Sequence, residues 1–314
     1  MDVRVCYVLA DGELGRYADM ACISAASLRR AHPDREIILL CDVPTAEAIR
    51  RTGHPLQGLT DSIVSAAAPH PTAAERSRWL KTSLRTLVPG HLLYLDVDTV
   101  VVRPVELPIA SGVHALAAAD ACDHHGRPVQ DVAPWVRLLF DRLGWTLPAI
   151  YRNAGVVFFR DTREGHAFGE RWHTEWSRSA AAGCHRDQPA FNAAVGSMRR
   201  AVGLLPLRFN AMPTYRPRLA RGAAIYHFWA EQTLNLERPS SLLDHLVSVY
   251  ARTGAVDHAT IEWCRRHNYP WMQRHGIRVA LRAGAYRVAA RALLGRPYRA
   301  IGPGEGGQGK PGRL

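Results

Sequence analysis

Short apolar runs alternate with amphipathic segments through the first hundred residues, and this alternation restricts the chain to few folds. Strand-like runs cover residues 3–10, 36–42, 62–68 and 91–102, and helical patterns cover 16–32, 45–53 and 73–88. This order predicts an α/β fold, in which helices connect the strands of a largely parallel sheet and cover both of its faces. Ligands of such sheets bind beyond the carboxyl ends of the strands. Acidic residues occupy three of these ends: Asp11, the pair Asp96 and Asp98, and Asp120.

The second half continues with strands and helices in a less regular order. Strand-like runs cover residues 113–120, 153–160, 202–210 and 223–229, and helical patterns cover 165–178, 238–252 and 255–268. At 314 residues the chain is long enough for one large domain or two modest ones.

The composition, with 47% hydrophobic and 22% charged residues, is ordinary for a soluble globular protein. No run of about 18 apolar residues occurs, and no basic segment precedes an apolar stretch at the N-terminus, so we expect neither a membrane span nor a signal peptide. The six cysteines are scattered, which favours reduced thiols in a cytoplasmic protein over a dispersed disulfide set. Of the formal charge of +12, the residues from Cys264 onward carry +10. The body is therefore nearly neutral, and we expect no nucleic-acid-binding surface.

Two carboxylates interrupt an apolar run in the stretch "HLLYLDVDTVVVRP", residues 91–104. If this run is one strand, Asp96 and Asp98 project to the same side and aim their oxygens at one point. Burying either charge unpaired would cost several kcal/mol, so we expect a counter-cation, and hard oxygen ligands suit Mg²⁺ or Mn²⁺. The alternative is a pair of acids at a strand end that are solvated or paired with Arg103.

The same motif is similar to the nucleophile loop of phosphatases of the haloacid-dehalogenase type, an apolar strand that ends in Asp-x-Asp-x-Thr/Val. That resemblance implies hydrolysis of a phosphate ester by Asp96 and Asp98. Those enzymes also need a downstream lysine and a further acidic pair, and no lysine lies between Asp98 and Lys310. The phosphatase is therefore kept as an alternative.

Five stretches, in order, resemble the GT-A glycosyltransferases, and family 8 of the glycosyltransferases in particular. They are "CYVLADGELGRYADMACISAASLRRAHPD", "SRWLKTSLRTLVPGHLLYLDVDTVVV", "VHALAAAD", "YRNAGVVFFR" and "HRDQPAFNAAV". The resemblance covers residues 3 to about 229. It implies a GT-A fold, with a Rossmann-like mixed sheet flanked by helices. It also implies a hexosyltransferase that uses a nucleotide sugar, most commonly UDP-linked, with Mn²⁺ or Mg²⁺, and that retains the anomeric configuration.

The resemblance also implies roles for individual residues. Asp187 and Gln188 would stand beside the anomeric carbon, as a nucleophile or as electrostatic stabilisers. The implied metal ligands are Asp96, Asp98 and His227. The implied donor-binding residues are Ala10, Asp11, Arg78, Lys81, Asp96, Val97, Asp120 and Asn153.

Lys81 has an additional argument in the composition. Only Lys81 and Lys310 are lysines, against 38 arginines, which indicates a site that needs a compact ammonium group instead of a planar guanidinium. Arg78 lies one turn earlier on the same helical face, so both cations can reach the nucleotide or its diphosphate.

Structural interpretations of these residues stay open as well. Lys81 could lie on a solvated helix face, Asp187 could be a helix N-cap ahead of Pro189, and His227 could be a core histidine bonded to a backbone carbonyl. The chain also departs from the family after His227, because "HFWAEQTLNLERP" lacks the glycine and lysine of His-x-x-Gly-x-x-Lys-Pro. This departure leaves the donor open. From another class, a non-catalytic nucleotide-sugar-binding protein is a further alternative.

We expect a catalytic domain over residues 1–235, divided into a nucleotide-binding half (1–104) and a sugar- and acceptor-binding half (105–235). A helical region over 236–300 and a disordered, Gly/Pro-rich tail over 301–314 would follow. If residues 272–296 form one helix, its apolar stripe consists of Ile277, Leu281, Ala285, Val288 and Ala292 and is flanked by arginines. Such a helix is typical of peripheral contact with an anionic membrane face, which would favour a lipid-linked acceptor. The alternative is a helix docked on the domain and a soluble saccharide or small-molecule acceptor.

Overall fold

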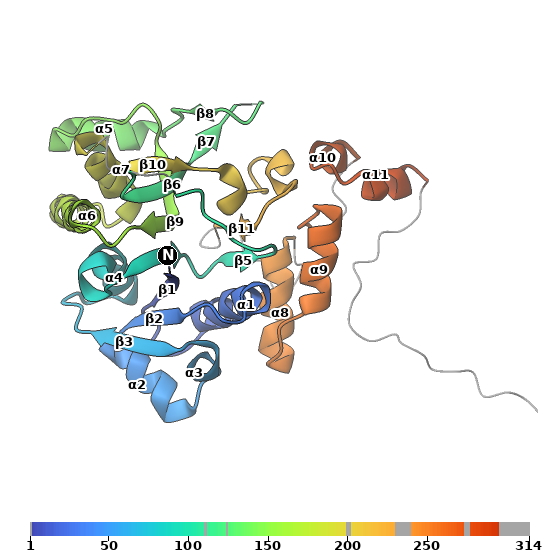
Figure 1. Cartoon of the computed structure of the whole chain (residues 1–314), viewed down its shortest axis with the longest axis horizontal. Helices are drawn as coiled ribbons and strands as arrows, with labels where there is room; N and C mark the ends of the chain where they lie inside the picture. Colours follow the sequence, from blue (N-terminus) through green and yellow to red (C-terminus); the bar gives the residue numbers. More distant parts are fainter. Residues whose placement is uncertain are drawn as a thin grey trace, which may run out of the picture.

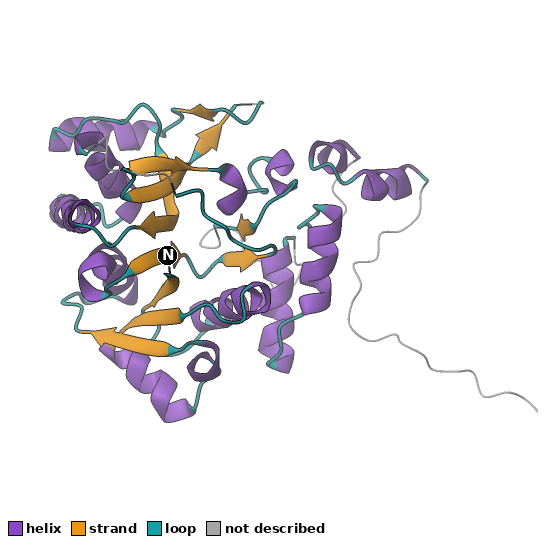
Figure 2. Ribbon diagram, viewed as in Figure 1, coloured by secondary structure: helices purple, strands orange, loops and turns teal. Residues whose placement is uncertain are grey.

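The computed structural model describes residues 2–109, 112–123, 125–198, 202–229, 240–272 and 277–294. Within these residues a central sheet has the strand order β10-β6-β9-β4-β1-β2-β3 (Figures 1 and 2). Its strands are β1 Val3–Leu9, β2 Ile37–Asp42, β3 Ser62–Ala66, β4 His91–Leu95, β6 Ala115–Ala119, β9 Arg152–Phe159 and β10 Val202–Leu205. Neighbouring strands are parallel, except that β9 runs antiparallel to both β4 and β6. The predicted mixed α/β sheet is therefore confirmed.

Successive side chains of a strand point to opposite faces of the sheet, and in these strands the side chains on both faces are apolar. Helices therefore cover both faces. On β1, Val5 and Tyr7 pack in one core, while Cys6 and Val8 pack in the other. The first core is closed by α1 Arg16–Ala31, α2 Val43–Thr52, α3 Leu56–Leu59, α8 Leu242–Thr253 and α9 His258–His267. The second is closed by α4 Ala73–Leu87, α6 Arg163–Ala181 and α7 Asp187–Ser197. A smaller cluster joins α5 Pro134–Leu143 to α7. The six cysteines are free thiols, and five of them are buried.

The expected strand over residues 91–102 is wrong, because the chain turns between β4 and β5 Thr99–Val101. The backbone N–H of Thr99 donates to the Asp96 carbonyl at 3.2 Å and closes the turn. After the turn, β5 leaves the central sheet and pairs antiparallel with β11 Ile225–His227. A further small pair joins β7 Ala121–Cys122 to β8 Pro128–Val129.

The expected strand over residues 202–210 is shorter than predicted. β10 ends before Pro206, which has no N–H for a sheet, and the 3₁₀ helix η1 Leu207–Phe209 follows. A second 3₁₀ helix, η2 Pro217–Ala220, leads toward β11.

The C-terminal part begins with α8, which packs against α1, and continues with α9 beside it (Figure 1). The single helix expected over residues 272–296 is wrong, because α10 Ile277–Arg282 and α11 Tyr286–Leu293 are separate helices. Gly284, at φ +72°, lies between them, and a left-handed residue interrupts an α-helix. Residues 273–276 and the predicted tail 301–314 lie outside the described residues. In the described part of the chain, no helix has both the length and the hydrophobicity that a membrane span requires.

Candidate functional site

The turn between β4 and β5 places two carboxylates at the carboxyl edge of the sheet. The N–H of Asp96 donates to the carbonyl of Gly155 at 2.7 Å, and the Thr99 hydroxyl donates to the carbonyl of Asp96 at 2.7 Å. Asp96 and Asp98 therefore converge because of a hydrogen-bonded turn, and not because they alternate along one strand as predicted.

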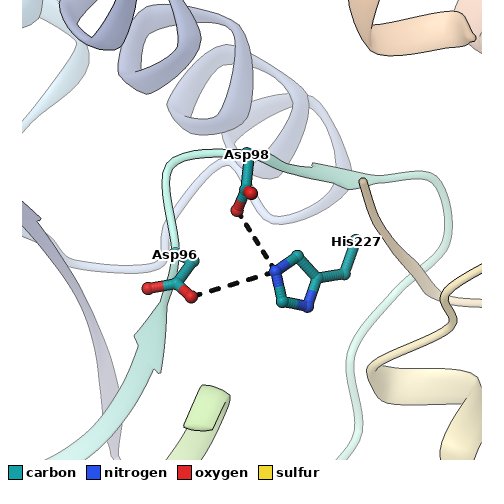
Figure 3. A group of neighbouring side chains, drawn as sticks. All are labelled: Asp96, Asp98 and His227. Carbon is teal, nitrogen blue, oxygen red and sulfur yellow. Dashed lines mark ion pairs between the residues drawn. The ribbon is translucent and has the colours of Figure 1, made fainter. Parts of the chain in front are cut away.

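The third member of this group is His227, which arrives from β11. Its backbone is paired with Thr99 of β5, so it stands directly opposite the acidic turn. Its Nε2 lies 3.2 Å from Oδ1 of Asp98 and 3.8 Å from Oδ2 of Asp96, and Figure 3 shows the imidazole pointing at both carboxylates. Burial lowers the pKa of His227, but the carboxylates of Asp98 and Asp96 outweigh burial and raise this pKa above its ordinary value.

These three side chains fit a divalent cation. One ligand atom from each of Asp96, Asp98 and His227 lies within 4.8 Å of the others. Two carboxylates and one imidazole are a donor set that suits ions such as Mn²⁺. Gly155 leaves the space that the group occupies, since a Cβ there would lie 2.7 Å from Oδ2 of Asp96 and would touch the ring of His227. The structure thus has a candidate Asp–Asp–His metal site.

A lysine lies next to this group and does not lie on a solvated helix face. Lys81 is 3% exposed, and its Nζ lies 2.9 Å from Oδ1 of Asp96 and 2.9 Å from Oδ2 of Asp187. Nε of Arg78 lies 3.1 Å from Oδ1 of Asp187. Burial works against the charge of Lys81, but Asp187 and Asp96 outweigh it and raise the pKa of the ammonium group. In the same way Lys81 and Arg78 outweigh burial and lower the pKa of Asp187.

Asp187 opens α7 but is not its N-cap. The N-cap is Arg186, which makes no side-chain capping bond, and the Asp187 carboxylate faces the two cations instead. The competing structural interpretation of this acid is therefore wrong.

The amide side chains of Asn153 and Gln188 form a hydrogen-bonded cluster with Asp120. Nδ2 of Asn153 donates to Oδ1 of Asp120 and to Oε1 of Gln188, both at 3.1 Å. The N–H of Ala154 also donates to Oε1 of Gln188, at 3.3 Å. Burial raises the pKa of Asp120 above its ordinary value, against the hydrogen bonds it accepts. This cluster offers polar groups that can hold hydroxyl groups of a ligand.

One cavity of about 560 Å³ brings together all of the site residues that the sequence predicted. They are Ala10, Asp11, Arg78, Lys81, Asp96, Val97, Asp98, Asp120, Asn153, Asp187, Gln188 and His227. Their individual roles remain predictions. Residues 230–239, where the chain departs from the family motif, lie outside the described residues.

Sequence reasoning missed several residues of the cavity wall. Tyr94 donates its hydroxyl to Oδ1 of Asp96, and its place two residues earlier on β4 could have indicated this contact. Trp135 and Arg186 also line the cavity, and the guanidinium of Arg186 lies 5.6 Å from the ring centroid of Trp135. Trp229 also lines the cavity, with a backbone φ of +52°. No local sequence pattern predicts that Trp135, Arg186 and Trp229 line one cavity, because they come from segments far apart in the chain.

No family model and no curated protein matches the chain. Among solved structures, its fold is similar to that of the galactosyltransferase LgtC, solved in complex with donor and acceptor sugar analogues. The TM-score is 0.51 and the identity 18%, over 74% of this chain and 88% of that one. A comparison with the apo form of mouse xyloside xylosyltransferase 1 gives a TM-score of 0.48 and 12% identity, over 75% of this chain and 100% of that one. The first likeness, together with the mixed seven-stranded sheet, shows that the chain has the predicted GT-A fold.

Proposed function

We propose that the protein is a metal-dependent glycosyltransferase of the family-8 type. It transfers a hexosyl group from a nucleotide sugar, UDP-linked, to a saccharide, lipid-linked or small-molecule acceptor and retains the anomeric configuration. The observation that carries this proposal is the convergence, in one cavity of a GT-A fold, of the Asp96–Asp98–His227 group with the Lys81–Asp187 ion pair.

The residues that line the cavity fall into groups with separate roles in the proposed reaction. Ala10, Asp11 and Val97 bind the nucleoside, near the carboxyl ends of β1 and β4. Asp96, Asp98 and His227 hold Mn²⁺ or Mg²⁺, which neutralises the departing diphosphate when bound. Arg78 and Lys81 supply further positive charge next to Asp96 and Asp187.

The sugar binds next to this metal site. Asn153 and Asp120 bind its hydroxyl groups. Because Lys81 and Arg78 lower the pKa of Asp187, this carboxylate stays ionised at neutral pH and can stabilise positive charge at the anomeric carbon. Two N–H donors hold the side-chain oxygen of Gln188, so the amide is fixed beside Asp187.

The test is donor hydrolysis with the purified protein and a panel of UDP-sugars. UDP release is expected with Mn²⁺, and Asp98→Asn is expected to reduce the rate about 100-fold or more, because the metal ion supplies several kcal/mol of stabilisation and each 1.36 kcal/mol is tenfold. Asp141→Asn, at an exposed position of α5, is the matched control and keeps the wild-type rate.

Other outcomes would support the alternatives. Release of phosphate from p-nitrophenyl phosphate without UDP release would replace the proposal with the phosphatase. Nucleotide-sugar binding without turnover, over a broad panel of acceptors, would replace it with the binding protein.

We also propose that α10 and α11 contact an anionic membrane surface at its cytoplasmic face. The predicted apolar stripe does not face outward as a whole, because Ala285 and Val288 are buried in the core of the domain. Other large apolar side chains are exposed, namely Leu281 of α10, Tyr286 and Leu293 of α11, and Leu294 directly after α11. The arginines between them are exposed too, namely Arg278, Arg282, Arg287 and Arg291. No acidic residue occurs in residues 277–294. Apolar side chains beside arginines are the pattern of a helix at a lipid headgroup layer, which favours a lipid-linked acceptor.

A further inference from the structure

Three buried side chains connect the candidate metal site to the sugar-binding part of the cavity. Nδ1 of His227 lies 2.8 Å from Oδ1 of Asn210, and Nδ2 of Asn210 donates to Oδ1 of Asn153 at 2.9 Å. Asn210 has no exposed surface, and His227 and Asn153 are 2% and 6% exposed. Water is therefore excluded from these bonds, and each polar atom depends on the partner it has in the protein.

One backbone group determines which atom donates and which accepts in each hydrogen bond among these three side chains. The N–H of Gly155 donates to Oδ1 of Asn153 at 2.9 Å, and a backbone N–H can only donate. The atom of Asn153 at this position is therefore the carbonyl oxygen, so Asn210 must present its amino group there. The carbonyl oxygen of Asn210 then faces His227 and requires a proton on Nδ1.

This sequence of bonds has a consequence for the other imidazole nitrogen. With the proton held on Nδ1 in the neutral ring, Nε2 has a lone pair, and it points at the carboxylates of Asp98 and Asp96. Nε2 and the two carboxylates thus face one point with their lone pairs, and a bound cation would stabilise this arrangement.

The backbone keeps Asn210 in register with His227. Asn210 follows η1 directly, and its N–H donates to the Leu207 carbonyl at 3.1 Å. The next residue, Ala211, accepts a hydrogen bond from the N–H of His227 at 2.8 Å. The two segments thus lie side by side, and the side-chain bond does not depend on a flexible loop.

We propose that Asn210 is a positioning residue, which holds His227 in the tautomer and orientation of a metal ligand. The proposal rests on the metal site of the proposed function. It goes further by assigning a task to a residue that is neither a candidate metal ligand nor part of the cavity wall, and by linking the metal site to the proposed sugar site through Asn153.

The test is a calorimetric titration of the purified protein with Mn²⁺ alone. Relative to wild type, Asn210→Ala is expected to weaken Mn²⁺ binding about 10- to 100-fold, the usual effect of removing a partner of a ligand histidine. Asn210→Asp keeps an oxygen that accepts from Nδ1 but loses the amino group that donates to Asn153, so this variant is expected to retain more Mn²⁺ affinity than Asn210→Ala and less than wild type. If the alanine variant does not fold in EDTA, as judged by circular dichroism, Asn210→Leu replaces it, because leucine has a similar shape and forms no hydrogen bonds.

Asn192→Ala is the matched control. Asn192 is as buried as Asn210, and it bonds both backbone groups of Arg152 without reaching His227. The control is expected to lower the unfolding temperature and to keep the Mn²⁺ affinity.

The outcomes separate the two proposals. If wild type does not bind Mn²⁺, both the metal-dependent function and the role of Asn210 are overturned. If wild type binds Mn²⁺ and Asn210→Ala binds it equally well, only the role of Asn210 is overturned. The role of Asn210 alone is also overturned if Asn192→Ala loses as much Mn²⁺ affinity as Asn210→Ala. Equal losses of Mn²⁺ affinity in Asn210→Asp and Asn210→Ala would overturn it too.

Discussion

At the residue scale, Lys81 shows how one ammonium group can form ion pairs with two carboxylates. It lies 2.9 Å from a carboxylate oxygen of Asp96 and of Asp187 while being almost fully buried. A guanidinium would place its charge farther from the chain and over a larger volume, which gives a physical reason for a lysine in a chain that otherwise uses arginine.

Replacing Lys81 by methionine removes this charge and keeps the unbranched side chain up to the position of Cε. Loss of one partner of a buried ion pair costs about 3–5 kcal/mol, and we expect about 3 kcal/mol because the side chain of Asp96 is 23% exposed. Urea unfolding in metal-free buffer measures this difference. The double variant Lys81→Met/Asp187→Asn is expected to regain part of the loss, and equal instability of both variants would contradict the assignment.

Gly155 is the second residue whose identity follows from its neighbours. A methyl group on its Cα would lie 3.0 Å from Oδ1 of Asn153 and would collide with Asp96 and His227. We expect Gly155→Ala to displace the imidazole and to weaken Mn²⁺ binding at least tenfold, as loss of a ligand's orientation does.

Calorimetric titration with Mn²⁺ measures the effect of Gly155→Ala. The control is Gly58→Ala, because a Cβ at that position meets no atom within 4 Å. Unchanged Mn²⁺ affinity in Gly155→Ala would show that the three side chains are not a metal site.

At the scale of elements, the N-terminus of α9 illustrates how a cap depends on pH. Asp257 accepts from the N–H of Thr260 at 3.0 Å, from the Thr260 hydroxyl at 2.6 Å and from Nε2 of His245 at 3.0 Å. Burial raises the pKa of Asp257, but these hydrogen bonds outweigh burial and lower it from 3.8 to about 2.

Asp257→Ala removes this cap, and we expect a loss of about 1–2 kcal/mol in the free energy of unfolding at pH 7. Since the pKa in the folded state is below the unfolded value of 3.8, the charged form stabilises the fold above pH 4. The difference between wild type and variant should therefore shrink as the pH falls from 4 toward 2. Urea unfolding at several pH values measures it. Asp257→Asn, which keeps a capping oxygen without the charge, should lose less stability at pH 7, and an equal gap for Asp257→Ala at pH 3 and pH 6 would refute the assignment.

At the scale of the whole molecule, the distribution of charge is the main feature. The residues from Cys264 onward carry +10 of the total of +12. α10 and α11 lie at one end of the described part of the molecule, beyond α9 (Figure 1). These two helices carry exposed arginines and leucines. The exposed arginines of these two helices are the basis of the proposed membrane contact.

We expect the protein to co-sediment with vesicles that contain phosphatidylglycerol and not with vesicles of phosphatidylcholine alone. Each arginine near an anionic surface contributes about 1 kcal/mol, so replacing Arg278, Arg282, Arg287 and Arg291 by glutamine should reduce binding by two orders of magnitude or more. The matched control replaces four exposed arginines elsewhere, Arg50, Arg51, Arg137 and Arg142. Binding that ignores lipid charge and salt concentration, or equal losses in both variants, would contradict the proposed membrane contact.

Local patterns of the sequence determined much of this molecule. Apolar runs and amphipathic segments predicted the strands and helices of the first half, because the period of a helix or a strand is visible within about ten residues. Polar residues at the ends of these strands, together with the family motifs, predicted which side chains gather in one cavity.

The tertiary structure alone decided the geometry of that cavity. The turn at Asp96, the antiparallel insertion of β9 and the bond from Asn210 to His227 join residues that are far apart in the chain or that break the local period. In the C-terminal segment, apolar and basic periodicity alone could not show that the helix breaks at Gly284. Periodicity records what each segment buries, whereas a hydrogen bond between distant side chains depends on which segments the packed core brings together.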